Sequence, residues 1–223
     1  MTKPAEIPSL SRRLRDGLER VATVLRSERW GALEKTPLNP TQAQILALIQ
    51  GNKNKPERIS AIARHLGVSQ PTATDSIISL EKKGLVSRHP DPRDGRAVGV
   101  VATEVGRVLA GKIGARTTAT DRALAALTRG EQEEFLRLLV KLIRNLQIAG
   151  AIEPQRLCVT CRYFQPHAHP GARAPHHCAY VDAPLGADGL RLDCSEHEAL
   201  PTEQQEAAWS RYAEGLAPRP APP

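Results

Sequence analysis

Residues 59–106 constrain the fold of this chain more than any other segment. The stretch ISAIARHLG carries apolar residues at intervals of three and four positions: Ile59, Ile62, Ala63 and Leu66. This spacing predicts one buried face of a short helix. Gly67 can adopt the left-handed conformation that ends a helix, and the Ser69 hydroxyl can cap the next one. The segment therefore predicts two helices joined by a tight turn.

The second helix is expected over residues 70–83, with Ala73, Ile77 and Leu80 on its buried face. Polar residues at its start and on its outward and flanking faces are then free to contact a partner. They are Ser69, Gln70, Thr72, Thr74, Asp75, Ser76 and Ser79.

A β-hairpin is expected directly after these helices. The segments LVSRH and AVGVVA are rich in β-branched residues, and they flank the turn sequence PDPRDG with its Asp94-Gly95 pair. Arg93 and Arg96 lie at the hairpin tip, where guanidinium groups can enter a minor groove or contact phosphates. A helix pair followed by a basic hairpin is typical of a winged helix-turn-helix that binds DNA. A protein-interaction domain of the same shape is the alternative.

Charge favours DNA as the partner. Residues 1–150 carry 25 Lys and Arg against 15 Asp and Glu, while residues 151–223 carry 6 against 9. A basic excess of this kind suits phosphate contact and predicts salt-dependent binding. The basic residues proposed to contact DNA are Lys82, Arg88, Arg93 and Arg96.

The segment from LNPTQAQILALIQ through KKGLVSR and the D-x-R-D-x-R wing resembles the MarR family of winged-helix transcription regulators over about the first 150 residues. The resemblance implies a homodimer that binds a palindromic operator in double-stranded DNA, usually as a repressor released by an effector. Two positions depart from the family. Asp75 stands where the family often has a basic residue, and Ala102-Thr103 replaces its usual Leu-Thr.

Helices on both sides of this module are expected to form the dimer interface. Leu10, Leu14, Leu18, Val21 and Leu25 form one apolar stripe, residues 103–128 are expected to continue as helix, and the segment EQEEFLRLLVKLIRNLQIAG is apolar on more than one face. The first 150 residues contain only two aromatic side chains, Trp30 and Phe135, so the sequence offers no support for a small-molecule effector cleft.

All four cysteines of the chain lie between residues 156 and 198: Cys158, Cys161, Cys178 and Cys194. A C-x2-C pair followed by two single cysteines is a workable set of ligands for Zn²⁺ or for a [4Fe–4S] cluster. Two disulfides are the weaker explanation in a reducing compartment. The intervening composition is too poor in apolar residues to form its own core, so a metal centre is expected to stabilise it.

The sequence favours a [4Fe–4S] cluster slightly over zinc, and both metals remain open. CVTCRYFQ and the later HHC resemble the cysteine spacing of high-potential iron-sulfur proteins, but Leu-Asp precedes the fourth cysteine where those proteins have Gly-Trp. Five of the seven histidines also lie here. His176, His177 and His197 are close enough to cysteines to act as hydrogen-bond donors around the centre.

The predicted fold class is mainly α with a small β-hairpin wing: a winged helix-turn-helix dimer with a helical dimerisation region and a metal-stapled C-terminal appendage. The expected divisions are 1–37 and 107–152 for dimerisation, 38–106 for DNA binding, 153–199 for the metal module, and 200–223 for a short helix and a Pro-rich tail. Trp209 and Tyr212 are expected to dock that helix onto the protein.

The predicted function is DNA-binding regulation without enzymatic activity, in which the metal centre senses redox, iron or metal status and changes the spacing of the two DNA-binding heads. Two alternatives remain: a ligand-responsive repressor with a structural zinc site, and an electron carrier whose winged helix binds protein. No apolar run approaches the ~18 residues of a membrane span, and no signal peptide is recognisable, so a cytoplasmic protein is expected.

Overall fold

The computed structural model describes residues 8–51, 56–91 and 94–214. Its helices are α1 (Leu10–Leu33), α2 (Pro40–Gly51), α3 (Ile59–Leu66), α4 (Gln70–Lys82), α5 (Glu104–Gly114), α6 (Ala119–Ala125), α7 (Arg129–Ile148) and α8 (Thr202–Glu214). Its strands are β1 (Glu57–Arg58), β2 (Val86–Asp91), β3 (Asp94–Ala102), β4 (Phe164–Gln165), β5 (His176–Cys178) and β6 (Ala183–Leu185). The 3-10 helices are η1 (Cys158–Thr160) and η2 (Ala187–Gly189). The mainly helical class with a small β wing is confirmed.

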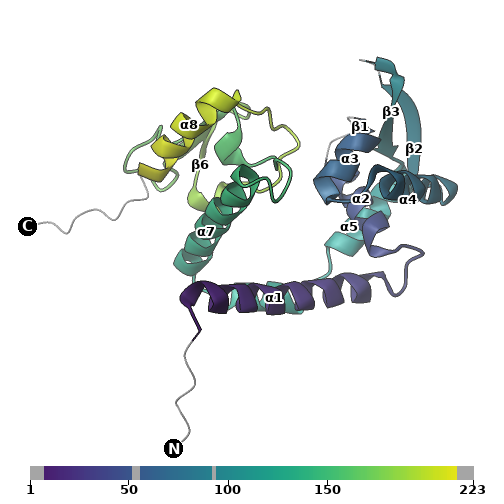
Figure 1. Cartoon of the computed structure of the whole chain (residues 1–223), viewed down its shortest axis with the longest axis horizontal. Coiled ribbons are helices and arrows are strands. Elements are labelled where there is room, and N and C mark those ends of the chain that lie inside the picture. The colour runs from purple at the N-terminus through teal and green to yellow at the C-terminus, as the bar shows by residue number, and fades with distance from the viewer. Residues whose placement is uncertain (1–7, 52–55, 92–93, 215–223) are drawn as a thin grey trace, which may run out of the picture.

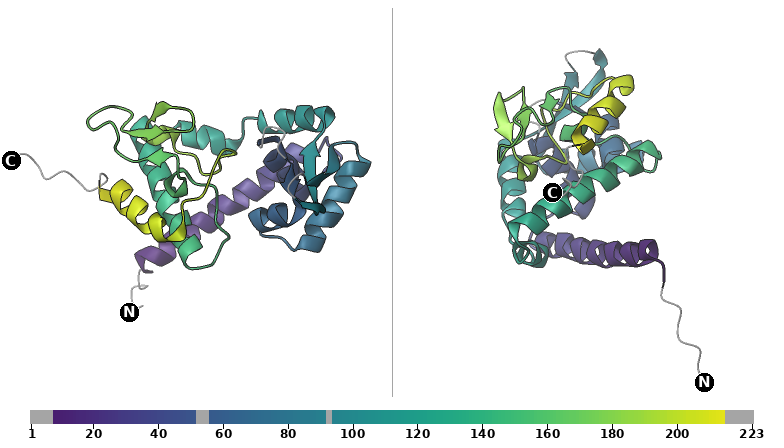
Figure 2. Two further views of the ribbon diagram at one scale, coloured as in Figure 1. Left: turned by 90° about the horizontal axis from the view of Figure 1, so that it is seen from above. Right: turned by 90° about the vertical axis from the view of Figure 1, so that its left-hand side faces the viewer.

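The elements form two lobes above a common base (Figure 1). The first lobe contains α2 to α5 with β1 to β3, and the second contains α7, α8 and the chain between them. The long helix α1 runs along one side of both lobes, and the turned views of Figure 2 show it on that same side.

The first lobe is the winged helix-turn-helix that the sequence predicts. α3 ends at Gly67, whose φ of 64° lies in the left-handed region, and the Ser69 hydroxyl caps α4 by accepting from the N–H of Thr72. β3 lies between β1 and β2 in an antiparallel sheet. The core of this lobe is aliphatic and includes Ile45, Leu46, Ile62, Ile77, Leu80, Val86 and Val100.

Thr103 closes the base of the wing. Its N–H donates to the carbonyl of Leu85 at 3.0 Å, and its hydroxyl donates to the carbonyl of Gly84 at 2.7 Å. The hydroxyl also accepts from the N–H of Gly106 at 3.1 Å, which caps α5. A Cβ on Gly106 would lie 2.0 Å from the Leu85 carbonyl oxygen, so this close approach requires glycine.

Residues 103–128 do not continue as one helix, so that expectation is wrong. α5 ends at Gly114, and α6 begins after Thr118, which forms a capping box with Asp121. In this box each side chain bonds the backbone N–H of the other residue, which satisfies groups that a new helix start leaves unpaired. Thr128 and Glu131 form the same box at the start of α7.

The second lobe has a small core of its own that the cysteine segment shares with two helices. Tyr212 of α8 is 1% exposed and lies with Val140 of α7 and Leu157, Val159 and Leu190 of the cysteine segment. The predicted docking of α8 through Trp209 and Tyr212 is thereby confirmed. The cysteine segment therefore shares a core with α7 and α8, which supply the apolar partners that its own composition lacks.

Apolar side chains remain exposed along two helices of the single chain. On α1 they are Leu10, Leu14, Leu18, Val21, Val24, Leu25 and Trp30, and on α7 they are Phe135, Leu138, Leu142, Leu146 and Ile148. Exposed apolar stripes of this length usually mark an interaction surface. Within the described residues, no helix combines the length and apolarity needed to cross a lipid bilayer.

Candidate DNA interface and metal centre

The exposed face of α4 begins at its capped N-terminus. Ala73, Ile77 and Leu80 are buried as predicted, and Gln70, Thr72 and Asp75 are exposed together with the capping residue Ser69. The hydroxyl of Thr74 is half-buried and donates to the carbonyl of Gln70 at 2.8 Å. Side chains at the N-terminal end of the second helix are those that reach base edges in this type of domain.

Two predicted DNA-contacting residues lie elsewhere. Ser76 is only 8% exposed, so its expected position beside the outward face is wrong. Ser79 is half-buried, and its hydroxyl accepts from the side-chain amide of Gln42 at 3.0 Å. Ser76 lies three residues after Ala73 and four before Leu80, at the edge of the buried face of α4. The Gln42 contact shows that α2 reaches the Ser79 side of this helix.

The described basic residues at the end of α4 and on β2 differ in their partners. Lys82 is exposed at the end of α4, whereas Lys83 donates to the carbonyl of Pro37 and to Gln42, and so ties α4 to the chain before α2. Arg88 on β2 is exposed and forms an ion pair with Glu81 at 2.6 Å.

The structure describes the two arginines predicted at the wing tip only in part. Arg93 lies outside the described residues, and Arg96 belongs to β3, for which only the backbone is described at that position.

The four cysteines surround one cavity of about 110 Å³. Cys158 begins η1 and Cys161 follows it, Cys178 ends β5, and Cys194 lies on the loop after η2. Cys161 is buried and the other three are half-buried, and all four are free thiols. The C-x2-C turn and two separate segments thus bring the four predicted ligands to the wall of one cavity, while no three of the described His, Cys, Asp or Glu residues are placed to hold a single metal ion.

Aromatic and aliphatic side chains complete the cavity wall. Tyr163, Phe164, Tyr180, Val181 and Leu185 line it together with Gly189, Arg191 and Glu196. The rings of Tyr163 and Tyr180 meet edge to face with centroids 5.4 Å apart. The hydroxyl of Tyr163 donates to Glu198 and that of Tyr180 donates to Glu196, each at 2.8 Å.

Arg191 contacts two of the cysteine sulfurs. Its backbone N–H donates to Cys158 Sγ at 3.2 Å, and its guanidinium Nη1 lies 3.8 Å from Cys194 Sγ. Burial nevertheless raises the pKa of the Cys158 thiol to about 11, so without a cation it is protonated at neutral pH. A metal ion or cluster would supply the positive charge that the thiolate form requires.

The nearby histidines lie outside the lining of this cavity as far as the chain is described. The ring of His176 is 3% exposed and packs against Phe164 and Tyr212, with centroids 5.2 and 5.5 Å away. His177 faces Asp182 at 3.2 Å, and His197 Nε2 lies 3.0 Å from the Thr160 hydroxyl. A role of His176, His177 or His197 as donor to the centre stays a prediction.

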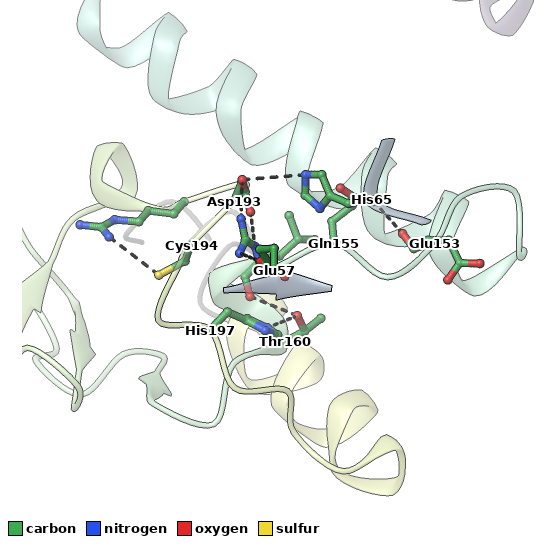
Figure 3. Close-up of polar contacts among 11 residues, drawn as sticks. Glu57, His65, Glu153, Gln155, Thr160, Asp193, Cys194 and His197 are labelled. Carbon is green, nitrogen blue, oxygen red and sulfur yellow. Dashed lines mark hydrogen bonds and ion pairs between the residues drawn. The ribbon is translucent and has the colours of Figure 1, made fainter. Parts of the chain in front are cut away.

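A bridge of polar side chains joins the cysteine segment to the winged domain, and no sequence pattern predicts it. The guanidinium of Arg156 binds both carboxylate oxygens of Asp193, at 2.5 and 3.0 Å, and reaches Glu57 of β1 at 3.4 Å. On its other side Asp193 lies 3.9 Å from His65 Nε2 of α3. Figure 3 shows Asp193 facing His65 and Glu57, with Cys194 as its chain neighbour.

A backbone hydrogen bond joins the same two segments, because the N–H of Cys194 donates to the carbonyl of Arg156 at 3.1 Å. Cys194 of the cavity also directly follows Asp193, which lies beside His65 of the helix-turn-helix. Only three-dimensional contacts bring these positions together, since Arg156 and Glu57 are 99 residues apart in the chain.

A capped second helix beside a hairpin wing defines the class of a winged helix-turn-helix transcription regulator. A sequence profile of the MarR family matches residues 38–98. Over 126 residues the chain is 35% identical to the HTH-type transcriptional repressor Rv2887 of Mycobacterium tuberculosis, a match that covers 56% of this chain and 89% of that protein. The repressor Mb2911 of Mycobacterium bovis matches to the same extent. The chain belongs to the MarR family.

Solved structures share the fold. The transcriptional regulator SlyA superposes with a TM-score of 0.52 at 22% identity, over 60% of this chain and 96% of that one. Staphylococcus aureus MepR in a MepR-DNA complex superposes with the same TM-score at 20% identity, over 63% of this chain and all of that one. The profile match ends at residue 98, well before the first cysteine.

Proposed function

We propose that this protein is a homodimeric repressor that binds a palindromic operator in double-stranded DNA and has no enzymatic activity. The observation that carries the proposal is the exposed, Ser69-capped start of α4 beside the wing. Gln70, Thr72 and Asp75 would read base edges, while Lys82, Arg88 and the wing arginines Arg93 and Arg96 would contact the backbone or the minor groove. The matched relatives are named repressors, and MepR has been solved with DNA.

The dimer is supported by the exposed apolar stripes of α1 and α7. A second copy that covered them would remove Leu14, Leu18, Phe135 and Leu138 from water, each now at least 42% exposed. A two-fold dimer places two α4 helices one DNA turn apart, which matches a palindromic site.

DNA binding is tested with a duplex selected from a random library by the purified protein. The double variant Gln70→Ala with Thr72→Ala should lose discrimination between that duplex and a scrambled one, measured by fluorescence anisotropy. Arg211→Ala on α8 removes a charge far from the winged domain and serves as the control. A double variant that still discriminates between the two duplexes as well as the wild-type protein and the control do would show that α4 does not read DNA.

The second part of the proposal concerns control of DNA binding. The four cysteines would hold a metal centre whose redox or metal state the protein senses. The Arg156–Asp193 pair would carry that state to β1 and α3, since Cys194 follows Asp193 directly and Glu57 and His65 contact the pair. Movement of the Cys194 loop would then shift the DNA-binding head relative to α7, and so relative to the second head of the dimer.

Two other functions remain candidates: a ligand-responsive repressor with a structural zinc site, and an electron carrier. A structural zinc site would leave operator affinity independent of oxidation, and an electron carrier would show no operator at all. A small-molecule effector is favoured by one observation: a cavity of about 450 Å³ lies between α1, α2, α5 and α6, lined in part by Leu25, Ala47 and Ile113. A screen of aromatic acids for release of the operator duplex tests that candidate.

A further inference from the structure

We infer that the four-cysteine cavity is the site of a [4Fe–4S] cluster, with one cysteine for each iron and with Arg191 as the residue that positions and tunes it. The inference rests on the proposed metal centre and specifies its chemistry. Its basis is that the four cysteines line a cavity and are not arranged around the position of a single ion.

The size of the cavity separates the two metals. In a mononuclear zinc site each sulfur lies about 2.3 Å from the ion, so four sulfurs enclose no free volume. Here Cys158, Cys161, Cys178 and Cys194 are four of the twelve residues that line a volume of about 110 Å³, whereas one water needs only about 10–15 Å³. Among the described residues, no three His, Cys, Asp or Glu side chains stand as ligands of a single ion. The space suits a group of several atoms.

The wall of the cavity suits a cluster rather than a solvated ion. Tyr163, Phe164 and Leu185 line it, and the more exposed Tyr180 and Val181 (47% and 59%) complete its apolar surface. An apolar wall limits water access and lowers the local dielectric, two of the factors that set cluster stability and potential. A structural zinc ion with a complete thiolate set has no need of such a wall.

The charges around the sulfurs point the same way. Four thiolates outweigh the positive charge of a cluster core, so the loaded centre is anionic and needs compensation. Arg191 provides it at two sulfurs, through its backbone N–H to Cys158 Sγ at 3.2 Å and its guanidinium 3.8 Å from Cys194 Sγ. The Glu196 carboxylate also lies at the wall, but its Oε2 accepts from the Tyr180 hydroxyl.

Hydrogen bonds and positive charge at cluster sulfurs raise the reduction potential, because they stabilise the more negative reduced state. Arg191→Gln removes the charge and leaves the backbone N–H in place. The variant should keep its iron but show a lower midpoint potential, and Arg191→Lys should recover part of the difference. An unchanged potential in Arg191→Gln, at full iron content, would show that Arg191 does not tune the centre.

The inference is tested on the full-length protein, purified without air and then reconstituted with ferrous iron and sulfide. We expect about four irons and four sulfides per chain, with a broad visible absorption band. Cys178→Ser and Cys194→Ser should lose the band, and His169→Ala, a change outside the cavity wall, should keep it. Wild-type protein that takes up one zinc per chain and no iron or sulfide overturns the inference, and this readout holds even if a serine variant fails to fold.

The same samples separate this inference from the proposed function. Colourless zinc protein that still binds its selected duplex would refute the cluster and leave the repressor intact. Brown protein with full iron and sulfide that binds no duplex would refute DNA binding and leave the cluster intact.

Discussion

The two lobes of this molecule are stabilised in different ways. The winged domain has an aliphatic core that runs through α2, α3, α4 and its sheet, and its helix ends are capped by side chains. The cysteine lobe has a small core centred on Tyr212, three very short strands and four thiols around a cavity. Loss of a ligand should therefore change the second lobe and leave the first folded, which is the separation that a sensor and its output need.

The largest difference in stability between the two lobes is expected when the proposed ligands are removed. Cys158→Ser with Cys178→Ser should destabilise the cysteine lobe by on the order of 4 kcal/mol, as loss of a metal site typically does. Amide exchange followed by mass spectrometry should show reduced protection over residues 157–199 and unchanged protection over α3 and α4. Equal loss of protection in both lobes would mean that they fold as one unit.

A second variant tests the core of the same lobe without touching a cysteine. Tyr212→Ala removes a ring that is 1% exposed and should cost about 3–5 kcal/mol, as large-to-small core changes do. Tyr212→Phe keeps the ring and should cost less than about 1.5 kcal/mol. Chemical denaturation monitored in the cysteine lobe measures both losses of stability. A loss well below about 3 kcal/mol in Tyr212→Ala would mean that the core around Tyr212 does not stabilise the lobe.

The third prediction concerns the winged domain, where the expected effect falls on affinity rather than stability. Arg93→Ala with Arg96→Ala should weaken binding to all duplexes, because fewer phosphates are then neutralised by the protein. The slope of log affinity against log salt should fall by about 1 for each phosphate that the variant no longer neutralises. Anisotropy titrations at several salt concentrations measure the slope. Unchanged binding would exclude the wing from the interface.

The smallest expected effect lies between the lobes. Arg156→Gln removes a half-exposed ion pair with Asp193 and should cost only about 1 kcal/mol of stability. Its main result should be a smaller difference in operator affinity between loaded and stripped protein, at unchanged metal content. Arg162→Gln, which breaks the exposed pair with Glu198, is the matched control. A full response in Arg156→Gln would mean that the signal takes another route.

The sequence predicted the parts of the fold that depend on local patterns. The buried face of α4, the left-handed Gly67, the Ser69 cap and the docking of Trp209 and Tyr212 follow from spacing and residue type. The break between α5 and α6 could also have been predicted, because Thr118 and Asp121 have the spacing of a capping box.

Other features depend on packing between distant segments and left no local signal. The hydrogen bond between Ser79 and Gln42 joins α4 to α2 across 37 residues of sequence, and α7 and α8 supply part of the core of the cysteine lobe. The Arg156–Asp193 pair with Glu57 and His65 joins residues that no periodicity relates. The cysteine spacing predicted a set of ligands, and the cavity between the four thiols adds the reason to choose a cluster.

The cysteine lobe, on our proposal, controls DNA binding by the winged domain. The direct test is the dissociation constant for the selected operator duplex, measured under anaerobic conditions for the protein with its centre loaded, stripped or oxidised. We predict that affinity differs at least about tenfold between the loaded form and one of the others, a coupling of about 1.4 kcal/mol. Equal affinity in all three states would contradict this proposal and leave the cysteine centre a structural element.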